Sequence, residues 1–188
     1  MYSIDLMMEE HAHILKLLAV MRKACGSILE GQAVNDNDFR KMIAFARNYA
    51  DKHHHGKEEK ILFKEMTQRL GPVGINLVQH GMLVEHDLGR LHISELEKML
   101  SQYKETPKTE YKLNILAEAI GYANLLQRHI EKENQVVYTY AKKNLPGDIL
   151  QWVDAQVSRF EADAKENKIQ QTCLQLLAEL SEKYLPEG

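Results

Sequence analysis

The chain has 188 residues, of which 44% are hydrophobic and 27% charged, as is ordinary for one globular domain. Its formal net charge of −3 gives no electrostatic reason to expect nucleic acid or an anionic membrane as a partner. No apolar run approaches the roughly 20 residues of a membrane span, and the acidic N-terminus carries no visible export signal. Two isolated cysteines do not make a disulfide framework, so we expect a cytoplasmic protein.

Helical periodicity fills most of the chain and is interrupted by short segments rich in Gly, Pro and Asn. It predicts four long helices, over residues 3–30, 38–69, 76–104 and 108–144, with one or two more between 147 and 185. Because short connections force consecutive helices antiparallel, the predicted fold is all-α: an up-down-up-down four-helix bundle with a C-terminal helical extension. We expect the bundle to occupy residues 1–144. The amphipathic extension, residues 145–188, would pack on the bundle or on a partner subunit, as in a homodimer.

Three residues with metal-binding side chains in the first half of the chain recur in the second half. In each half a histidine is followed, at the same separation, by another histidine that opens a His-x-x-x-Glu pattern. The shift in numbering that carries His11 onto His86 also carries His54 onto His129 and Glu58 onto Glu133, without a gap. We call this displacement the repeat shift. The first set is His11, His54 and Glu58, and the second is His86, His129 and Glu133.

Successive residues of an α-helix are about 100° apart around its axis. With this spacing, all six residues fall on the apolar stripes of their predicted helices. Buried imidazoles and carboxylates are costly without partners, and two cations would supply the missing charge. The His-x-x-x-Glu spacing puts both side chains on one helix face, so that a glutamate can bridge from one metal to the next. The pattern predicts a dinuclear site, for which iron suits the donors best and zinc or manganese can substitute.

Taken singly, these features have simpler explanations. A lone histidine on an apolar stripe is more often a hydrogen-bonded core residue, and one His-x-x-x-Glu pattern is common on helices. The run His53-His54-His55 could also chelate metal at the surface, and His55 with Glu59 is the next register to consider. The repetition on inward faces favours the metal site with His54, and it places His53 and His55 to either side of the stripe.

The same residues resemble the hemerythrin-like (HHE cation-binding) family. The matching segments are Glu10-His11, residues 54–63, Glu85-His86 with Gly89-Arg90, and residues 129–134, so the resemblance covers about residues 3–143. It implies a non-haem di-iron centre with a solvent-derived oxo or hydroxo bridge. The terminal ligands it implies are His11, His54, His86 and His129, and the bridging ligands are Glu58 and Glu133.

The chain departs from the oxygen-carrying members of that family in two ways. Those members have a fifth histidine, four residues from another on the third helix, whereas Met82 and Arg90 occupy the positions four residues from His86. Their last carboxylate is an aspartate five residues after a histidine, whereas Glu133 follows His129 by four. The pattern resembles the four-histidine, two-glutamate branch, which is associated with sensing of iron and oxygen, handling of nitric oxide or peroxide, and repair of iron centres.

Residues near the predicted ligands could tune the site. Tyr122 lies two turns from His129 on the same face and could donate to a bridging or bound oxygen species. Arg90 could neutralise a carboxylate or gate access. Each has a structural alternative, a packed tyrosine or an arginine whose head group reaches solvent. We expect Glu10 and Glu85 to point sideways, towards solvent or a neighbouring helix.

Two irons with two histidines each would be about five-coordinate, which leaves a position for a small diatomic or peroxide ligand. We therefore favour a protein that binds or senses iron and O2, NO or peroxide. A di-iron enzyme consuming peroxide or nitric oxide, or an iron donor for repair of iron centres, needs the same ligands, so whether the protein is an enzyme stays open. Purely structural metals would need a closed shell. A ferritin-like oxidase is disfavoured, because its paired Glu-x-x-His motifs are missing.

Overall fold

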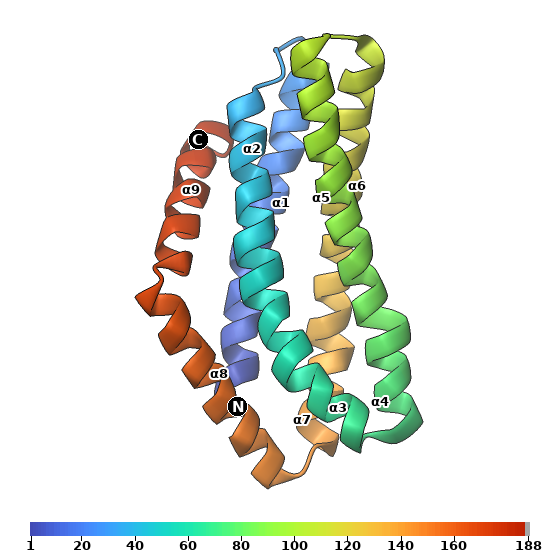
Figure 1. Cartoon of the computed structure of the whole chain (residues 1–188), viewed down its shortest axis with the longest axis vertical. Coiled ribbons are helices and arrows are strands. Elements are labelled where there is room, and N and C mark those ends of the chain that lie inside the picture. Colours follow the sequence, from blue (N-terminus) through green and yellow to red (C-terminus); the bar gives the residue numbers. More distant parts are fainter. Residues whose placement is uncertain (187–188) are drawn as a thin grey trace.

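The computed structural model describes residues 1–186, and in this part of the chain it contains helices and connections but no β-strand. Four rods stand side by side (Figure 1). The first is α1 (Tyr2–Leu29). The second is continuous through α2 (Asp36–Phe45), η1 (Ala46–His55), η2 (Glu58–Leu62) and α3 (Phe63–Arg69). The third comprises α4 (Gly71–Leu77), η3 (Val78–Met82) and α5 (Leu83–Glu105), and the fourth comprises α6 (Thr109–Lys132), η4 (Glu133–Val137) and α7 (Tyr138–Asn144).

The all-helical prediction is confirmed, and the third rod differs most from its expected range. It begins at Gly71 rather than at residue 76, because Pro72 occupies its first turn. A proline is tolerated there, since the first N–H groups of a helix have no partner within the helix. The Gly71-Pro72 pair, interpreted from the sequence as a break, instead starts the helix.

The segments labelled η are π-helical, with a wider turn than an α-helix, and they lie at the level of the predicted ligands. η2 begins at Glu58 and η4 begins at Glu133, each five residues long. The two segments are therefore related by the same repeat shift as the ligands. Such turns are rare and are frequently found at functional sites.

The core consists of two apolar clusters with the predicted ligands between them. On α1, Met7 belongs to one cluster and Ile14 to the other, and His11 lies between the two. On the fourth rod, Val137 belongs to the first of these clusters and Leu126 to the second, and His129 lies between them in the sequence. The apolar layers on both sides bury the histidines and fix the distances between the rods.

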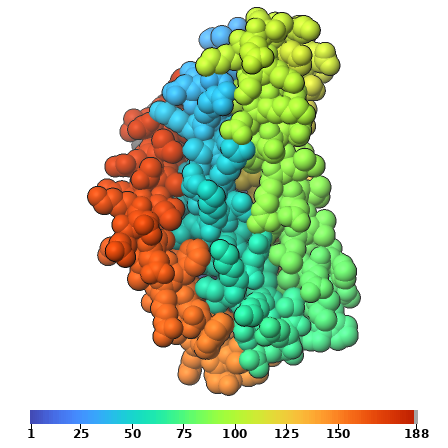
Figure 2. Space-filling model, in the orientation of Figure 1, coloured from blue at the N-terminus to red at the C-terminus, as the bar shows by residue number. Residues whose placement is uncertain are grey.

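The C-terminal helices α8 (Gly147–Glu166) and α9 (Ile169–Tyr184) lie along one side of the bundle (Figures 1 and 2). They contact α1, α2 and η1. They bury Val153, Val157, Leu177 and Leu180, so a continuous apolar face holds them against the bundle. Of the helices in residues 1–186, none is both long and apolar enough to cross a membrane.

We expect the turn between the second and third rods to depend on Gly74. A Cβ atom at this position would lie 2.6 Å from the carbonyl oxygen of Met66 and 2.7 Å from Cβ of Leu70, so one of these backbones would have to move. We predict that Gly74→Ala lowers the free energy of unfolding by about 1–3 kcal/mol, because of this overpacking. Denaturant titration of the metal-free protein measures the change.

The control is Gly26→Ala, since a Cβ atom at Gly26 would have nothing within 4 Å. This substitution should raise the free energy of unfolding by roughly 0.5–1 kcal/mol, as is usual for glycine replaced within a helix. Equal stability of the Gly74→Ala variant and the unmodified protein would contradict the prediction.

Candidate metal centre

The six predicted ligands come together in one buried layer. They lie on all four rods: one on α1, two on η1 and η2, one on α5, and two on α6 and η4. Each has an exposed fraction of 1% or less. The residues brought together are His11, His54, Glu58, His86, His129 and Glu133.

The histidines form two pairs whose Nε2 atoms face each other. The Nε2 atoms of His11 and His54 are 2.9 Å apart, and those of His86 and His129 are 3.2 Å apart. Two nitrogens bound at right angles to one metal, with bonds of about 2.1 Å, lie roughly 3 Å apart. The separation within each pair therefore matches two ligands of a single ion.

Acceptors on neighbouring helices fix the tautomers of these histidines. Glu10 Oε2 is 2.8 Å from His54 Nδ1, and Glu85 Oε2 is 3.0 Å from His129 Nδ1. Because an ionised carboxylate only accepts, each Nδ1 carries the proton and donates it. Glu10 and Glu85 thus reach a neighbouring helix, one of the two directions expected for them.

The other two candidate histidines are held in the same way. Asn134 Oδ1 is 2.8 Å from His11 Nδ1, and Glu59 Oε1 is 2.7 Å from His86 Nδ1. Glu59 and Asn134 are again related by the repeat shift, as are Glu10 and Glu85. Glu59 and Asn134 were not identified as acceptors from the sequence, although the repeat marks their positions. Such partners orient metal ligands and raise their basicity.

With every Nδ1 donating to its acceptor, a neutral ring has its lone pair at Nε2, directed at the other member of the pair. Two lone pairs at these distances repel each other, and the rings cannot turn away without losing their acceptors. Burial, followed by the neighbouring His11, lowers the pKa of His54 to about 4, so His54 is neutral at pH 7. A cation between the two Nε2 atoms removes the repulsion. At the other pair, burial lowers the pKa of His129, but the charge of Glu133 and hydrogen bonds to Glu133 and Glu85 outweigh it and raise this pKa to about 9, so that without a metal a proton on His129 takes the place of the cation.

The two glutamates lie between the histidine pairs. Glu133 Oε2 is 3.2 Å from His11 Nε2, and Glu133 Oε1 is 3.2 Å from His129 Nε2, so each oxygen faces one pair. Glu58 Oε2 is 3.7 Å from His54 Nε2 and 3.6 Å from His86 Nε2. This position between the pairs is the one that a bridging carboxylate needs.

Within the described residues, Glu58 Oε2 and both oxygens of Glu133 have no hydrogen-bond partner. Burial and the charge of Glu133 raise the pKa of Glu58 well above its ordinary value. At Glu133 burial acts in the same direction but is outweighed by His129 and His11, so its pKa lies well below the ordinary value. Unsatisfied buried carboxylate oxygens are rare, and two cations would satisfy all three.

The repeat is broken at the aromatic rings that pack on the ligands. Tyr138 stacks on His11 with ring centroids 5.6 Å apart, and its counterpart Phe63 stacks on His86 at 5.9 Å. The hydroxyl of Tyr138 donates to Glu58 Oε1 at 2.5 Å, a bond that Phe63 cannot make to Glu133. The sequence pattern points to Tyr122 and does not single out Tyr138.

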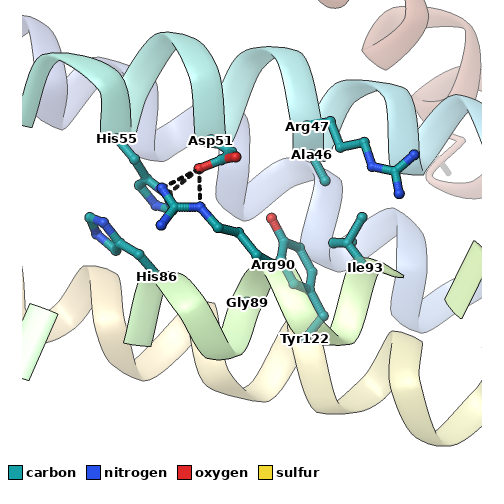
Figure 3. A pocket seen from close by; sticks show the side chains of 9 residues that line it. All are labelled: Ala46, Arg47, Asp51, His55, His86, Gly89, Arg90, Ile93 and Tyr122. Atoms are coloured by element: carbon teal, nitrogen blue, oxygen red, sulfur yellow. Dashed lines mark hydrogen bonds and ion pairs between the residues drawn. The ribbon is translucent and has the colours of Figure 1, made fainter. Parts of the chain in front are cut away.

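Tyr122 lines a small cavity of about 90 Å³ beside the site. Figure 3 shows Tyr122 at one end of this cavity, with His55 and His86 at the other. Gly89 lies in the wall, where a Cβ atom would be 3.6 Å from the Tyr122 ring. A role for Tyr122 towards an oxygen species stays a prediction.

Arg90 lines the same cavity and contacts three carboxylates. Its guanidinium donates to Glu59 Oε1 at 2.7 Å, to Asp51 Oδ1 at 2.9 Å and to Asp87 Oδ1 at 2.8 Å. Glu59 is the acceptor for His86, so Arg90 neutralises a carboxylate that holds a candidate ligand. This contact agrees with the expectation that Arg90 neutralises a carboxylate. An effect of Arg90 on a bound metal, or on access to it, stays a prediction.

A second cluster of titratable groups surrounds Lys57 beneath the C-terminal helices. Lys57 is fully buried and pairs with Glu10 of α1 and Glu161 of α8. His53 Nε2 is 3.0 Å from Glu10 Oε1, and Gln170 of α9 donates to Glu161 at 2.7 Å. Since the ammonium group of Lys57 already supplies the cation, we assign no metal to this cluster.

Comparison with known families agrees with this geometry. The sequence model of the hemerythrin HHE cation binding domain matches residues 2–141. The chain belongs to the hemerythrin family. Comparisons with curated proteins and with solved structures give no match. The hemerythrin match covers all four rods, and with them every histidine and glutamate of the candidate site, so it supports metal-ion binding there.

The Lys57 cluster gives a prediction about stability, because the repeat supplies a matched control. The counterpart of Lys57 is Lys132, which pairs with Glu85 but has a side chain 46% exposed. Lys57→Met leaves the buried Glu10 and the partly buried Glu161 without their cation, and we expect it to lower the free energy of unfolding by about 3–5 kcal/mol. Lys132→Met should cost about 0–1 kcal/mol. Denaturant titration of both variants measures the difference, and equal losses would contradict the prediction.

Proposed function

We propose that the protein holds two iron ions in this layer and uses them to bind or sense O2, nitric oxide or peroxide. The observation that carries the proposal is the pair of facing Nε2 atoms, repeated twice, with a fixed acceptor on every Nδ1. His11 and His54 would hold one ion, and His86 and His129 the other. Glu58 and Glu133 would bridge them, together with a solvent-derived oxo or hydroxo group. When bound, the iron pair would supply redox chemistry and positions for exogenous ligands.

The donor set also accommodates zinc or manganese, because affinity order alone does not select iron. We further propose an antiparallel up-down-up-down order for the four rods, supported by their short connections. Residues 1–144 would be the bundle and residues 145–188 an extension, which leaves a homodimer open. The buried free thiols of Cys25 and Cys173 support a location in the reducing cytoplasm.

A second candidate function is a di-iron enzyme that consumes peroxide or nitric oxide, or an iron donor for repair of iron centres. The cavity favours it, because His86 and His55 lie in its wall and small molecules have a route towards the ligands. Steady-state assays with H2O2 and with nitric oxide separate the two candidates. A sensor binds these molecules without sustained turnover, whereas an enzyme consumes them in excess over the protein. Release of iron to an apo acceptor protein would indicate the donor.

The test of the proposed function is metal analysis of anaerobically purified protein, with the visible and near-ultraviolet spectrum recorded before and after exposure to air. We expect two irons per chain and oxo-to-iron charge-transfer bands in air. His54→Ala and His129→Ala should each lose at least one iron and these bands, because each removes a nitrogen ligand.

The control is His80→Ala, since His80 is exposed and belongs to none of the clusters of candidate ligands. It should keep both metals and the spectrum of the unmodified protein. The proposal fails if the unmodified protein, purified anaerobically or reconstituted with Fe(II), holds fewer than two metals. It also fails if His54→Ala keeps both.

A further inference from the structure

The Lys57 cluster joins the C-terminal helices to the acceptor of a candidate ligand. The two carboxylate oxygens of Glu10 have different partners. Oε2 accepts from His54 Nδ1 at 2.8 Å, whereas Oε1 pairs with Lys57 and lies 3.0 Å from His53 Nε2. Lys57 also pairs with Glu161 of α8. A continuous path of polar contacts therefore runs from α8 to the Nδ1 atom that orients His54.

Both C-terminal helices contribute to this path. Gln170 of α9 donates to Glu161 Oε2 at 2.7 Å, and Glu161 Oε1 lies 3.2 Å from His53 Nε2. Phe160, the neighbour of Glu161 on α8, packs on the cluster. The centroid of its ring lies 5.9 Å from Lys57 Nζ and 5.6 Å from the centroid of the His53 ring. The C-terminal helices thus supply a charged partner and an apolar cover.

The repeat provides the same arrangement without that cover. In the second half, Glu85 accepts from His129 Nδ1 at 3.0 Å and pairs with Lys132, whose side chain is 46% exposed. The side chain of Lys57 is 0% exposed. Removing one partner from a buried ion pair is costly, whereas an exposed pair contributes little. The position of Glu10 therefore depends on α8, while the pairing of Glu85 with Lys132 takes place at the surface.

We propose that docking of α8 and α9 is coupled to metal binding by His11 and His54, with Glu161 as the positioning residue that joins them. The docked helices hold Lys57 and Glu10, so that Glu10 keeps His54 turned towards the ion. By thermodynamic linkage, an ion bound there stabilises the docked helices by the same factor. The inference rests on the proposed dinuclear centre and deepens it, because it adds a means of regulation to that site.

The coupling carries metal occupancy from the buried layer to the surface. The candidate ligands are at most 1% exposed, whereas α8 and α9 lie along the outside of the bundle (Figures 1 and 2). A sensor needs such a connection, because a partner cannot contact the buried ions themselves. The C-terminal helices are therefore the part of the chain through which a bound ion changes the surface of the protein.

Amide hydrogen exchange of the unmodified protein, metal-free and loaded anaerobically with two Fe(II) ions, tests the coupling without a substitution. Amides exchange through local opening. The metal does not slow an opening that leaves its site intact, but it slows undocking that loosens His54. We expect exchange in α8 and α9 to become slower on loading by about 5-fold or more, the lower end of couplings between distinct sites.

Equal exchange in these helices with and without two bound ions would overturn the coupling and leave the dinuclear site standing. Binding of fewer than two ions would instead refute the proposed function, and the coupling with it.

Substitution gives a second measurement. Glu161→Gln removes the charge but keeps the size of the side chain, and Lys57 keeps Glu10 as a partner, so the variant should fold, which circular dichroism checks. One of the two Fe(II) equivalents should bind about 5–10-fold more weakly in competition with a chromophoric chelator. Loading should no longer slow exchange in α8 and α9.

The control is Glu179→Gln, since Glu179 pairs with Lys41 at 2.6 Å and ties α9 to α2 through a side chain that is 58% exposed. This variant should keep both Fe(II) affinities and the slower exchange on loading. If Glu161 only stabilises the fold, Glu161→Gln lowers the free energy of unfolding but leaves both affinities unchanged. That result would overturn the proposal.

Discussion

The structure depends on one electrostatic constraint, the meeting of four imidazole Nε2 atoms and two carboxylates in a buried layer between two apolar clusters. Acceptors such as Glu10 and Glu85 hold each ring so that Nε2 faces inwards. The apolar clusters above and below keep the rods from moving apart. Neither rotation of the rings nor expansion of the core separates these groups, because each costs contacts elsewhere. Positive charge held between them relieves the strain, and this supports metal-ion binding in the layer.

The repeat extends beyond the ligands to the groups that hold them, yet the two halves differ in what surrounds them. Around His54 the acceptor Glu10 is buried under α8 and α9 and shares Lys57 with Glu161, whereas the corresponding contact of Lys132 is at the surface. The C-terminal helices therefore do more than cover apolar residues. They complete the charge balance of the group that orients His54, so the extension and the candidate metal site are energetically linked.

The buried layer of candidate ligands could be predicted from the sequence, because burial leaves a periodic pattern of apolar residues. His11 and His129 recur with apolar residues on their stripes, and the repeat shift needs no structure to be seen. The positions of His53 and His55 could not be assigned in this way. Periodicity locates a single buried face of a helix. The second rod is instead covered on several faces, by α1, by α5 and by the C-terminal helices. Tyr138 was missed because the choice between it and Tyr122 depends on the distance between rods, which periodicity does not contain.

The cavity beside the site connects the geometry of the candidate centre to its proposed function. It is lined by His86, a candidate ligand, and by Arg90, whose guanidinium donates to Glu59. Because Glu59 is also the acceptor for His86 Nδ1, the arginine that lines the cavity acts on the group that orients this histidine. At the other histidine pair, the hydroxyl of Tyr138 donates to Glu58, a contact without a counterpart in the second half of the repeat. A small molecule would therefore meet different surroundings at the two pairs, although the repeat makes their histidines and glutamates equivalent.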